Sequence, residues 1–314
     1  MDGILNINKP KDWTSHDVVA KVRKILGEKK IGHTGTLDPM ATGVLVLCVG
    51  RAVKLVQFLQ HQEKEYIADM TLGVVTDSLD ATGRVLETRK CHTSRDKIEE
   101  MLPDFRGEIE QTPPMVSAVK LKGEPLYKLA LRGEEVERPK RKVTISRLEL
   151  LDYKDGDHPV ATLSLQCSKG TYVRSLVADI GARLNCGAHV SQLVRTRVGN
   201  SHLADSFTLE TLETLAKEGK SSSALVSLEK AVRFLPGLWV KGQRAARVLN
   251  GHAVTADMLE RASPELKRGE IVRILDEKEQ LLAVGKIQMD LVQGLRKNEI
   301  VARLVRVIQI EHRA

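Results

Sequence analysis

Hydrophobic residues alternate with polar ones, or form short apolar runs, along much of the first two thirds of the chain. Glycine, proline, asparagine and aspartate residues, which favour turns, separate these stretches. Such a pattern is typical of strands with one or both faces buried. It predicts strands over residues 3–7, 44–47, 66–72, 84–88, 142–153 and 160–166.

A helical period of apolar positions lies between several of these strands. The clearest example follows Thr14 and Ser15, which can cap a helix N-terminus, and stops at Gly27, which suits a helix C-terminus. Its apolar face consists of Val18, Val19, Val22, Ile25 and Leu26. Further helices are expected over residues 52–59, 94–102, 173–184 and 209–218, which together with the strands predicts an α+β fold.

The pattern changes at about Leu238. A short helix is expected over residues 245–249, and strands over 269–275, 281–287 and 300–310. This arrangement predicts a small β-rich domain at the C-terminal end of the chain.

Residues 112–141 interrupt the alternation of strands and helices. The segment contains Gly123, Pro125, Gly133 and Pro139. From Lys120 to Arg147 the chain has nine Lys and Arg residues but only four Glu residues, so this stretch is basic. One short helix fits within it, with Leu126, Leu129 and Ala130 on one side. We interpret the segment as a basic insertion that projects from the core.

The whole chain of 314 residues carries a formal net charge of +8, with a pI near 9.3. A charge of this size favours a polyanionic partner such as a nucleic acid, although composition alone fits equally well a basic protein without such a partner. Aromatic residues are only 3% of the chain, so few rings are available to stack on bases.

The four cysteines, Cys48, Cys91, Cys167 and Cys186, are too far apart in sequence to form a zinc-binding pair. No signal peptide precedes them, and no apolar run reaches the roughly 18 residues that a membrane span requires. We therefore expect free thiols in a reducing cytosol, and no membrane association.

The most informative stretch for chemistry is Ile31–Val46, which has Asp38 at its centre. Gly32, Gly35 and Gly43 permit a close approach of the backbone to a ligand, and Pro39 keeps Asp38 out of the helical region. The stretch can therefore present one carboxylate on a stiff loop. An ordinary surface turn is the alternative. A nucleotide-binding P-loop is excluded, because its lysine-containing motif is absent.

Two other polar stretches were considered. Asp77 and Asp80 faintly suggest a calcium loop, but the required spacing and terminal glutamate are absent, so a turn between strands is favoured. Lys169, Gly170 and Arg174 lie at the start of an expected helix, where backbone N–H groups and basic side chains can bind a phosphate.

Several of these stretches, in the same order along the chain, resemble the bacterial tRNA pseudouridine-55 synthases, the TruB family. The matching stretches are Gly3–Ser15, Gly32–Gly43, Lys64–Tyr66, Thr76–Gly83, Phe105–Lys120, Cys167–Arg174 and Leu184–Val190. The departures are small: Thr36 stands where alanine is common in the family, and Met40 where leucine is common.

The resemblance implies a fold and a domain organisation. We expect a pseudouridine-synthase fold over residues 1–230, with a mixed, mostly antiparallel central sheet flanked by helices. The basic segment 112–141 would be a thumb insertion that grips the tRNA T-arm stem-loop. Residues 238–311 would be a PUA-like RNA-binding domain.

The family's reaction is isomerisation of the uridine at position 55 of tRNA, which is flipped out of its loop. The glycosidic bond breaks and C5 becomes bonded to the ribose, so no cofactor and no metal are expected. Asp38 matches the family's nucleophile. Attack on the ribose, attack on the base and assistance to elimination all remain open.

The resemblance also assigns roles to other residues. Tyr66 matches a tyrosine that stacks on the flipped base and is a candidate base, although without the resemblance a core aromatic would be favoured. Arg174 matches the arginine that pairs with the nucleophile; such a pair would keep Asp38 ionised. His33 matches a histidine placed where the base leaves its stack, with an ordinary structural histidine as the alternative.

Four further matches concern substrate binding. Tyr172 and Leu193 match residues that line the uracil pocket, though either could be ordinary core. Lys169 is a candidate phosphate ligand, and Lys9 matches an N-terminal motif in which a supporting role is favoured.

Two other functions compete with the isomerase. One is an RNA-folding protein in which Asp38 is dispensable, and the other is the catalytic subunit of a guide-RNA particle. The intact Asp38, Tyr66 and Arg174 favour the enzyme over the first. The absence of a long lysine-rich tail argues against the second. We expect a cytoplasmic monomer with tRNA as its partner and no obligate protein partner.

Overall fold

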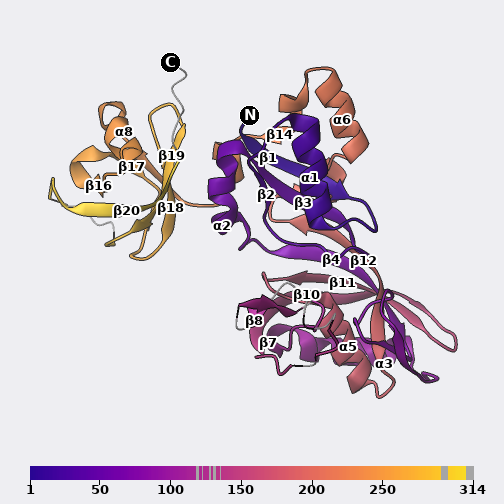
Figure 1. Cartoon of the computed structure of the whole chain (residues 1–314). Coiled ribbons are helices and arrows are strands. Elements are labelled where there is room, and N and C mark those ends of the chain that lie inside the picture. The colour runs from indigo at the N-terminus through magenta and orange to yellow at the C-terminus, as the bar shows by residue number, and fades with distance from the viewer. Residues whose placement is uncertain are drawn as a thin grey trace.

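The computed structural model describes residues 1–117, 120, 121, 123–126, 129, 132–134, 136–290 and 296–308. Within these residues the chain forms one large mixed sheet with helices packed on it and a separate smaller sheet at the C-terminal end (Figure 1). The expected α+β class is therefore confirmed, including the β-rich C-terminal part.

The large sheet contains ten strands within the described residues. In spatial order its main path is β14 (Leu225–Val226), β1 (Gly3–Lys9), β3 (Thr42–Val49), β12 (Ala188–Val198), β4 (Lys64–Leu72), β11 (Val160–Cys167), β10 (Arg141–Lys154) and β7 (Gly107–Gln111). The short strands β2 (Ile31–His33) and β13 (Ser201–His202) pair with β3 and β12. Neighbouring strands are antiparallel except for β3 and β12, which confirms the expected mixed, mostly antiparallel sheet.

Strand β12 occupies the centre of this sheet, between β3 and β4. The sequence pattern does not predict this strand, because charged residues interrupt its apolar positions. Its inward-facing residues include Leu193 and Arg195, which are 4% and 2% exposed. A buried arginine at a central strand therefore hid the alternation that marks strands elsewhere.

Two helices cover the β1–β3 end of the sheet. Helix α1 (Ser15–Leu26) begins at a capping box made by Thr14 and Asp17 and ends at Gly27 in the left-handed conformation, as the sequence predicted. Helix α6 (Leu209–Lys217) lies beside it (Figure 1). Their buried apolar faces pack with those of β1 and β3 in one cluster. This packing anchors the N-terminus of α1 close to the loop that follows β2.

Helix α5 (Val173–Arg183) packs on the other half of the sheet. Its residues Val173, Leu176, Val177 and Ile180 belong to the same apolar cluster as the inner residues of β4, β11 and β12. Helix α3 (Arg95–Met101), capped by Ser94, and the 3-10 helix η2 (Leu102–Phe105) border the same cluster. The N-terminal end of α5 thereby reaches the middle of the sheet.

The remaining elements of this part are short. The helix predicted over 52–59 is present, as the 3-10 helix η1 (Gly50–Leu55) followed by four α-helical residues. The short elements are α2 (Val56–Leu59), β5 (Val74–Thr76), β6 (Val85–Thr88), β8 (Lys120–Leu121), β9 (Glu124–Pro125), η3 (Leu203–Asp205), η4 (Ser221–Ala224) and α7 (Leu228–Ala231). The helix expected inside the insertion 112–141 falls largely outside the described residues, although Leu126 and Leu129 are described and buried.

Within its described residues, the C-terminal part forms a six-stranded sheet with a short α-helix and a 3-10 helix. Its order is β16 (Val254–Thr255), β20 (Ile300–Val307), β19 (Leu281–Ile287), β18 (Ile271–Leu275), β15 (Gly237–Val240) and β17 (Leu259–Ala262), with α8 (Gly242–Leu249) and η5 (Ala256–Met258) beside it. Trp239, Leu275 and Leu281 pack against apolar residues of the N-terminal part, including Ala52 and Leu55. The two parts therefore share an apolar contact.

All four cysteines are buried and free of disulfide bonds, in keeping with the expected thiols. None of the helices in the described part of the chain has the length and apolar content that a bilayer-spanning helix requires.

Candidate active site

A pocket of about 460 Å³ opens where the loop after β2, strands β4 and β12, and the start of α5 meet. Six of the candidate site residues predicted from the sequence line it: Asp38, Tyr66, Lys169, Tyr172, Arg174 and Leu193. The other residues in its wall are Thr34, Gly35, Thr36, Leu37, Gln60, Lys64, Ser117, Arg141, Gly170, Thr171, Val173 and Arg195. The pocket is thus the place where the candidate residues of distant segments converge.

Contacts from three directions fix the loop that carries Asp38. The Ser15 hydroxyl, at the start of α1, accepts a hydrogen bond from Leu37 N (2.8 Å) and donates one to Leu37 O (3.2 Å). The Lys9 ammonium donates to Pro39 O at 3.0 Å. The backbone between these anchors holds Asp38, whose own carbonyl accepts a hydrogen bond from Ala41 N. These contacts with Ser15 and Lys9 hold the backbone on both sides of Asp38.

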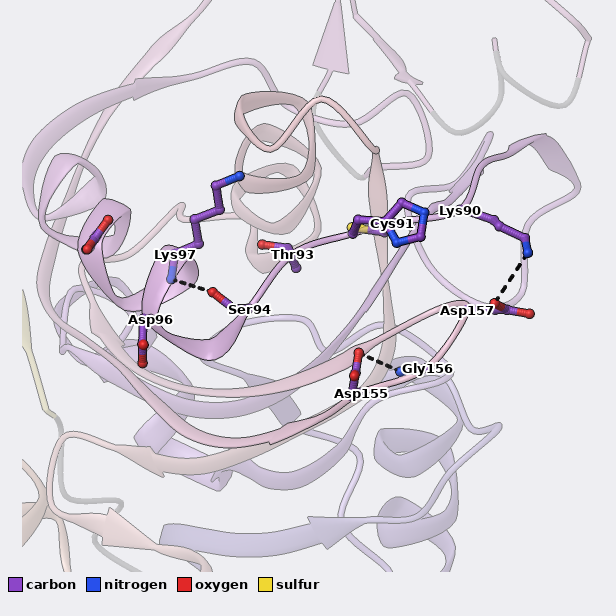
Figure 2. A pocket seen from close by; sticks show the side chains of 11 residues that line it. Lys90, Cys91, Thr93, Ser94, Asp96, Lys97, Asp155, Gly156 and Asp157 are labelled. Carbon is purple, nitrogen blue, oxygen red and sulfur yellow. Dashed lines mark hydrogen bonds and ion pairs between the residues drawn. The ribbon is translucent and has the colours of Figure 1, made fainter.

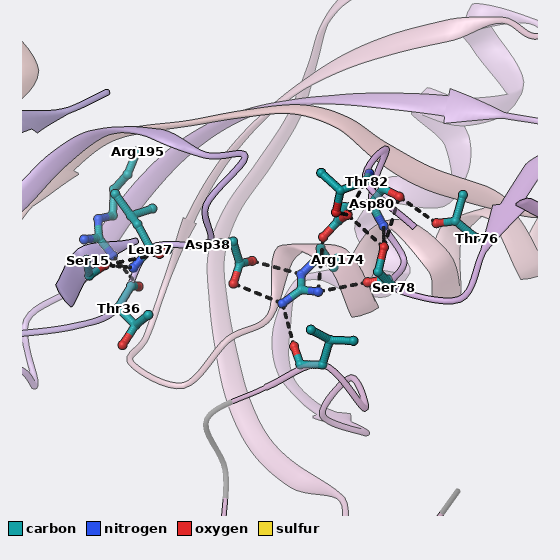
Figure 3. Close-up of polar contacts among 11 residues, drawn as sticks. Ser15, Thr36, Leu37, Asp38, Thr76, Ser78, Asp80, Thr82, Arg174 and Arg195 are labelled. Atoms are coloured by element: carbon teal, nitrogen blue, oxygen red, sulfur yellow. Dashed lines mark hydrogen bonds and ion pairs between the residues drawn. The ribbon is translucent and has the colours of Figure 1, made fainter. Parts of the chain in front are cut away.

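One edge of the Arg174 guanidinium lies against the two oxygens of the Asp38 carboxylate (Figure 3). Its Nη2 donates to Asp38 Oδ1 at 3.0 Å, and its Nε lies 2.9 Å from Asp38 Oδ2. The Nη2 contact is a charge-assisted hydrogen bond, whereas the Nε contact is an ion pair that is not aligned as a hydrogen bond. The Arg174 side chain is 3% exposed whereas that of Asp38 is 33% exposed, so the carboxylate remains open to the pocket.

A second carboxylate, Asp80, holds Arg174 from the other side. Its Oδ2 lies 3.2 Å from Arg174 Nη1, which also donates to Ser78 O at 2.9 Å. Asp80 Oδ1 accepts hydrogen bonds from the Ser78 and Thr82 hydroxyls, at 2.8 and 2.6 Å. The sequence predicts only a turn at Asp80. The stretch does form a turn, but Asp80 is buried and faces the pocket's arginine, a partner that sequence spacing does not show.

The ionisation of Asp38 reflects opposing effects. Burial raises the pKa of the Asp38 carboxyl above its ordinary value, the Arg174 charge and hydrogen bond lower it, and the Asp80 charge raises it. The net direction is upward. The expectation that the arginine alone would keep the carboxyl ionised was therefore incomplete, because burial and a second negative charge act against it.

Tyr66 and Leu193 form the part of the pocket that belongs to the sheet. Tyr66 lies on β4 and is 7% exposed, while Leu193 on β12 is 4% exposed. Burial raises the pKa of the Tyr66 hydroxyl, and the Arg195 guanidinium opposes that rise through its charge and a hydrogen bond. These side chains make a largely apolar floor with one phenolic hydroxyl.

Tyr172 precedes the first residue of α5, and Gln111 fixes its backbone. Gln111 Oε1 accepts a hydrogen bond from Tyr172 N (3.0 Å), and Gln111 Nε2 donates to Tyr172 O (3.3 Å). At the exposed rim nearby, Lys169 Nζ lies 3.1 Å from His61 Nε2. The sequence predicts that Lys169 can bind a phosphate. Its exposed position at the pocket mouth would allow it to contact the phosphate of a bound nucleic acid.

Two candidate residues lie outside the pocket wall. Lys9 is fully buried and donates to the carbonyls of Pro10, Trp13 and Pro39, and burial lowers its pKa to about 8. It therefore supports the Asp38 loop from behind. His33 ends β2 and is partly buried, and its Nδ1 has no hydrogen-bond partner within the described residues. Burial, Arg195 and His16 lower the pKa of His33.

A second hollow, of about 690 Å³, lies between the segment before α3 and the turn that joins β10 to β11 (Figure 2). Exposed charges of both signs line it, among them Lys90 and Asp157, which lie 3.8 Å apart. It contains none of the residues singled out from the sequence. Within the described residues, no group of three or more His, Cys, Asp or Glu side chains is arranged to hold a metal ion.

Comparison with protein families places these features in a known context. The model described as TruB family pseudouridylate synthase (N terminal domain) matches residues 23–173. The model of the tRNA pseudouridylate synthase B C-terminal domain matches residues 174–233, and the PUA domain model matches residues 236–306. The three matches follow one another along nearly the whole chain.

Curated relatives and solved structures agree with these matches. The tRNA pseudouridine synthase B of Symbiobacterium thermophilum is 50% identical over 254 residues, which are 81% of this chain and 83% of that protein. The enzyme of the same name from Stutzerimonas stutzeri is 44% identical over 293 residues, 92% of this chain and 93% of that protein.

Among solved structures, a crystal structure of a Cbf5-Nop10-Gar1 complex contains a chain that is 32% identical with a TM-score of 0.78, covering 98% of this chain and 85% of that one. The structure of an H/ACA RNP bound to a substrate RNA containing 2'-deoxyuridine gives the same TM-score at 29% identity, covering 99% of this chain and 86% of that one. The expected resemblance is thus confirmed: the chain belongs to the TruB family of pseudouridylate synthases, which are isomerases, and it carries a PUA domain.

Proposed function

We propose that this protein isomerises the uridine at position 55, in the T-arm loop of tRNA, to pseudouridine. The observation that carries the proposal is the Asp38 carboxylate, held by the Arg174 fork at the wall of a pocket with a largely apolar floor. Relatives that are named tRNA pseudouridine synthase B, and that align over most of this chain, support the substrate class.

The proposed chemistry needs one carboxylate and no external group. The bond between N1 of uracil and C1′ of the ribose breaks, and a bond forms between C5 and C1′. C5 then loses its hydrogen as a proton and N1, freed from the ribose, takes up a proton, so the overall change is an isomerisation. Asp38 acts as the nucleophile, which splits one difficult step into two easier ones. Its partly exposed carboxylate faces the pocket, whereas the two contacts with Arg174 keep its orientation fixed.

Arg174 and Tyr66 have complementary roles in this proposal. Arg174 favours the ionised form of Asp38 against the effect of burial, and Asp80 keeps Arg174 in place. Tyr66 stacks on the uracil ring, and its hydroxyl is the candidate to accept the proton released during rearrangement. A buried tyrosine hydroxyl is a weak base because it stays protonated. This role therefore depends on the Arg195 guanidinium, which favours the ionised form of the Tyr66 hydroxyl.

The target base must leave its loop to reach Asp38, at a cost of a few kcal/mol. Leu193 and Tyr172 provide apolar walls for the flipped base, whereas Lys169 at the pocket mouth can contact the phosphate backbone. His33, at the end of β2, is the candidate to take the place that the base leaves. Lys9 holds the Asp38 loop from behind.

We further propose that residues 1–230 form the catalytic domain and residues 238–311 the RNA-binding domain, of which 291–295 and 309–311 lie outside the described residues. The basic insertion at 112–141 would grip the T-arm as a thumb. The protein would act in the cytoplasm as a monomer. Its formal charge of +8 supports binding to RNA.

The test is to map pseudouridine at single-nucleotide resolution in an unmodified tRNA transcript treated with the protein. We expect one modified site, position 55, and the same site in a hairpin that contains only the T-arm. A matched transcript with cytidine at position 55 should remain unmodified. Modification at another uridine would contradict the proposed position, and no modification at all would contradict the proposed activity.

A further inference from the structure

We propose that Arg195 is a positioning residue for the isomerisation, because it fixes the backbone of the Asp38 loop relative to the strand that carries Tyr66. The proposal rests on the proposed function, and it assigns a role to a residue that the sequence pattern did not single out. Figure 3 shows Arg195 and Arg174 on opposite sides of the Asp38 loop.

The contacts of Arg195 are directed at the loop backbone. Its Nη1 donates to Thr36 O and its Nη2 to Gly35 O, each at 3.2 Å, while its Nε donates to Val44 O at 2.7 Å. These carbonyls lie just before and after the segment that contains Asp38. One planar guanidinium therefore joins both sides of the loop.

The register of the sheet places Arg195 beside the rest of the site. Arg195 on β12 lies directly opposite Tyr66 on β4, and opposite Gly43 on β3. A Cβ atom at Gly43 would lie 2.2 Å from Arg195 O, so the two strands are in close contact at this point. The Arg195 side chain thus contacts the nucleophile's loop and, through a hydrogen bond, the Tyr66 hydroxyl, while its backbone lies opposite Tyr66 in the sheet.

Arg195 has an unusual environment for a buried charge. It is 2% exposed, yet among the described residues no carboxylate lies within ion-pair distance of it. Three carbonyl oxygens replace the usual acidic partner. Burying a charge without a counter-ion is costly, and apolar packing would be the less costly way to fill this position. A requirement for the fork-shaped donor explains why an arginine is there.

Lysine cannot reproduce this arrangement. Its ammonium has three donors at one point, whereas the guanidinium spreads five donors over a rigid plane. Arg195→Lys therefore keeps the charge but releases part of the loop. A misplacement of a reacting group by about 1 Å can cost on the order of 100-fold in rate. Because Arg195 lies in the pocket wall, is only 2% exposed and makes these contacts with the protein's own backbone, RNA binding should change little.

The experiment compares Arg195→Lys with Arg197→Lys in the full-length protein. Arg197 is two residues further along β12, and its Nη2 pairs with Glu65 at 2.8 Å, away from the Asp38 loop. Single-turnover pseudouridine formation is measured at saturating enzyme, and tRNA affinity by filter binding, both well below the thermal unfolding midpoint. We expect Arg195→Lys to lower the rate about 10- to 100-fold with tRNA affinity within about threefold, and Arg197→Lys to leave both unchanged.

Three results would overturn the proposal: a rate of Arg195→Lys within twofold of the wild type, a loss that appears as weaker tRNA binding, or a loss proportional to the unfolded fraction. If Arg195→Lys does not fold, Arg195→Gln replaces it with the same expectation, since an amide can still donate to two of the carbonyls. A wild type that forms no pseudouridine would instead overturn the proposed function, so the two failures are distinguishable.

Discussion

Replacing Asp80 by asparagine tests how the buried ion network controls Asp38. The change removes one negative charge and keeps the size of the side chain. The asparagine oxygen can still accept the hydrogen bonds from Ser78 and Thr82. Its NH₂ group then points at the Arg174 guanidinium, and since both groups are hydrogen-bond donors, the contact is lost. Arg174 keeps its contacts with Asp38, Ser78 O and Val116 O.

The size of the effect follows from these contacts. Asp80 and Arg174 are 4% and 3% exposed, so the charged contact that is lost is a buried one. Hydrogen bonds to charged groups contribute about 1.5–3 kcal/mol, which we expect as the loss in free energy of unfolding. If Arg174 moves away from Asp38, the chemical step slows about 10- to 100-fold, which corresponds to roughly 1.4–2.7 kcal/mol in activation free energy.

Single-turnover rates at saturating enzyme measure the chemical step, and urea unfolding measures stability. The matched control is Asp77→Asn, because Asp77 lies on the same turn but is exposed and accepts a hydrogen bond from Arg84 N. We expect the control to remain within twofold of the wild-type rate. An Asp80→Asn protein with the wild-type rate, or one whose loss comes entirely from weaker tRNA binding, would refute the reasoning.

Three further predictions follow from the buried charges. First, because the pKa of Asp38 is raised, the chemical rate should fall on acidification at a higher pH than an exposed aspartate would give; Asp80→Asn, which removes a charge that raises this pKa, should move the acid limb to lower pH. An unmoved limb in single-turnover pH profiles would count against this. Second, a raised pKa in the folded state means that the ionised Asp38 destabilises the fold, an effect that grows as pH rises through that pKa and is absent below the ordinary carboxyl value. The difference in unfolding temperature, Asp38→Asn minus wild type, should therefore be more positive at neutral than at acidic pH. The opposite trend in thermal melts would disprove this. Third, Lys9→Met should lower the free energy of unfolding by about 1–3 kcal/mol, because the carbonyls of Pro10 and Trp13 lose their buried donor; a urea midpoint equal to that of the wild type would show that these carbonyls find other partners.

Local patterns in the sequence were sufficient for much of the fold. Helix α1 begins after Thr14 and ends before Gly27, as expected. The alternation of apolar and polar residues in β4, β10 and β11 corresponds to alternating buried and more exposed positions in the sheet. Strand β12 was not predicted, because one of its buried positions is occupied by an arginine, Arg195, rather than by an apolar residue. Helical period alone also did not distinguish η1 from an α-helix.

The candidate site was predictable only where a residue type in a motif carries the signal. Asp38 stood out through the glycines and the proline around it. Asp80 and Arg195 did not, because their roles come from residues that are far away in sequence: Arg174 is 94 positions from Asp80, and Thr36 is 159 positions from Arg195. The strand register that brings Arg195 opposite Tyr66 becomes visible only in the folded chain.

The measurement that most directly tests the central claim uses unmodified tRNA labelled with tritium at C5 of uridine. Pseudouridine formation must expel that hydrogen, so its release to water is followed with the wild type and with Asp38→Asn, and tRNA binding is measured for both. The account predicts release equivalent to one uridine per tRNA by the wild type, none by Asp38→Asn, and tRNA affinities within about tenfold, or ~1.4 kcal/mol, of each other. Equal release by the two proteins, or tight tRNA binding by the wild type without any release, would contradict it.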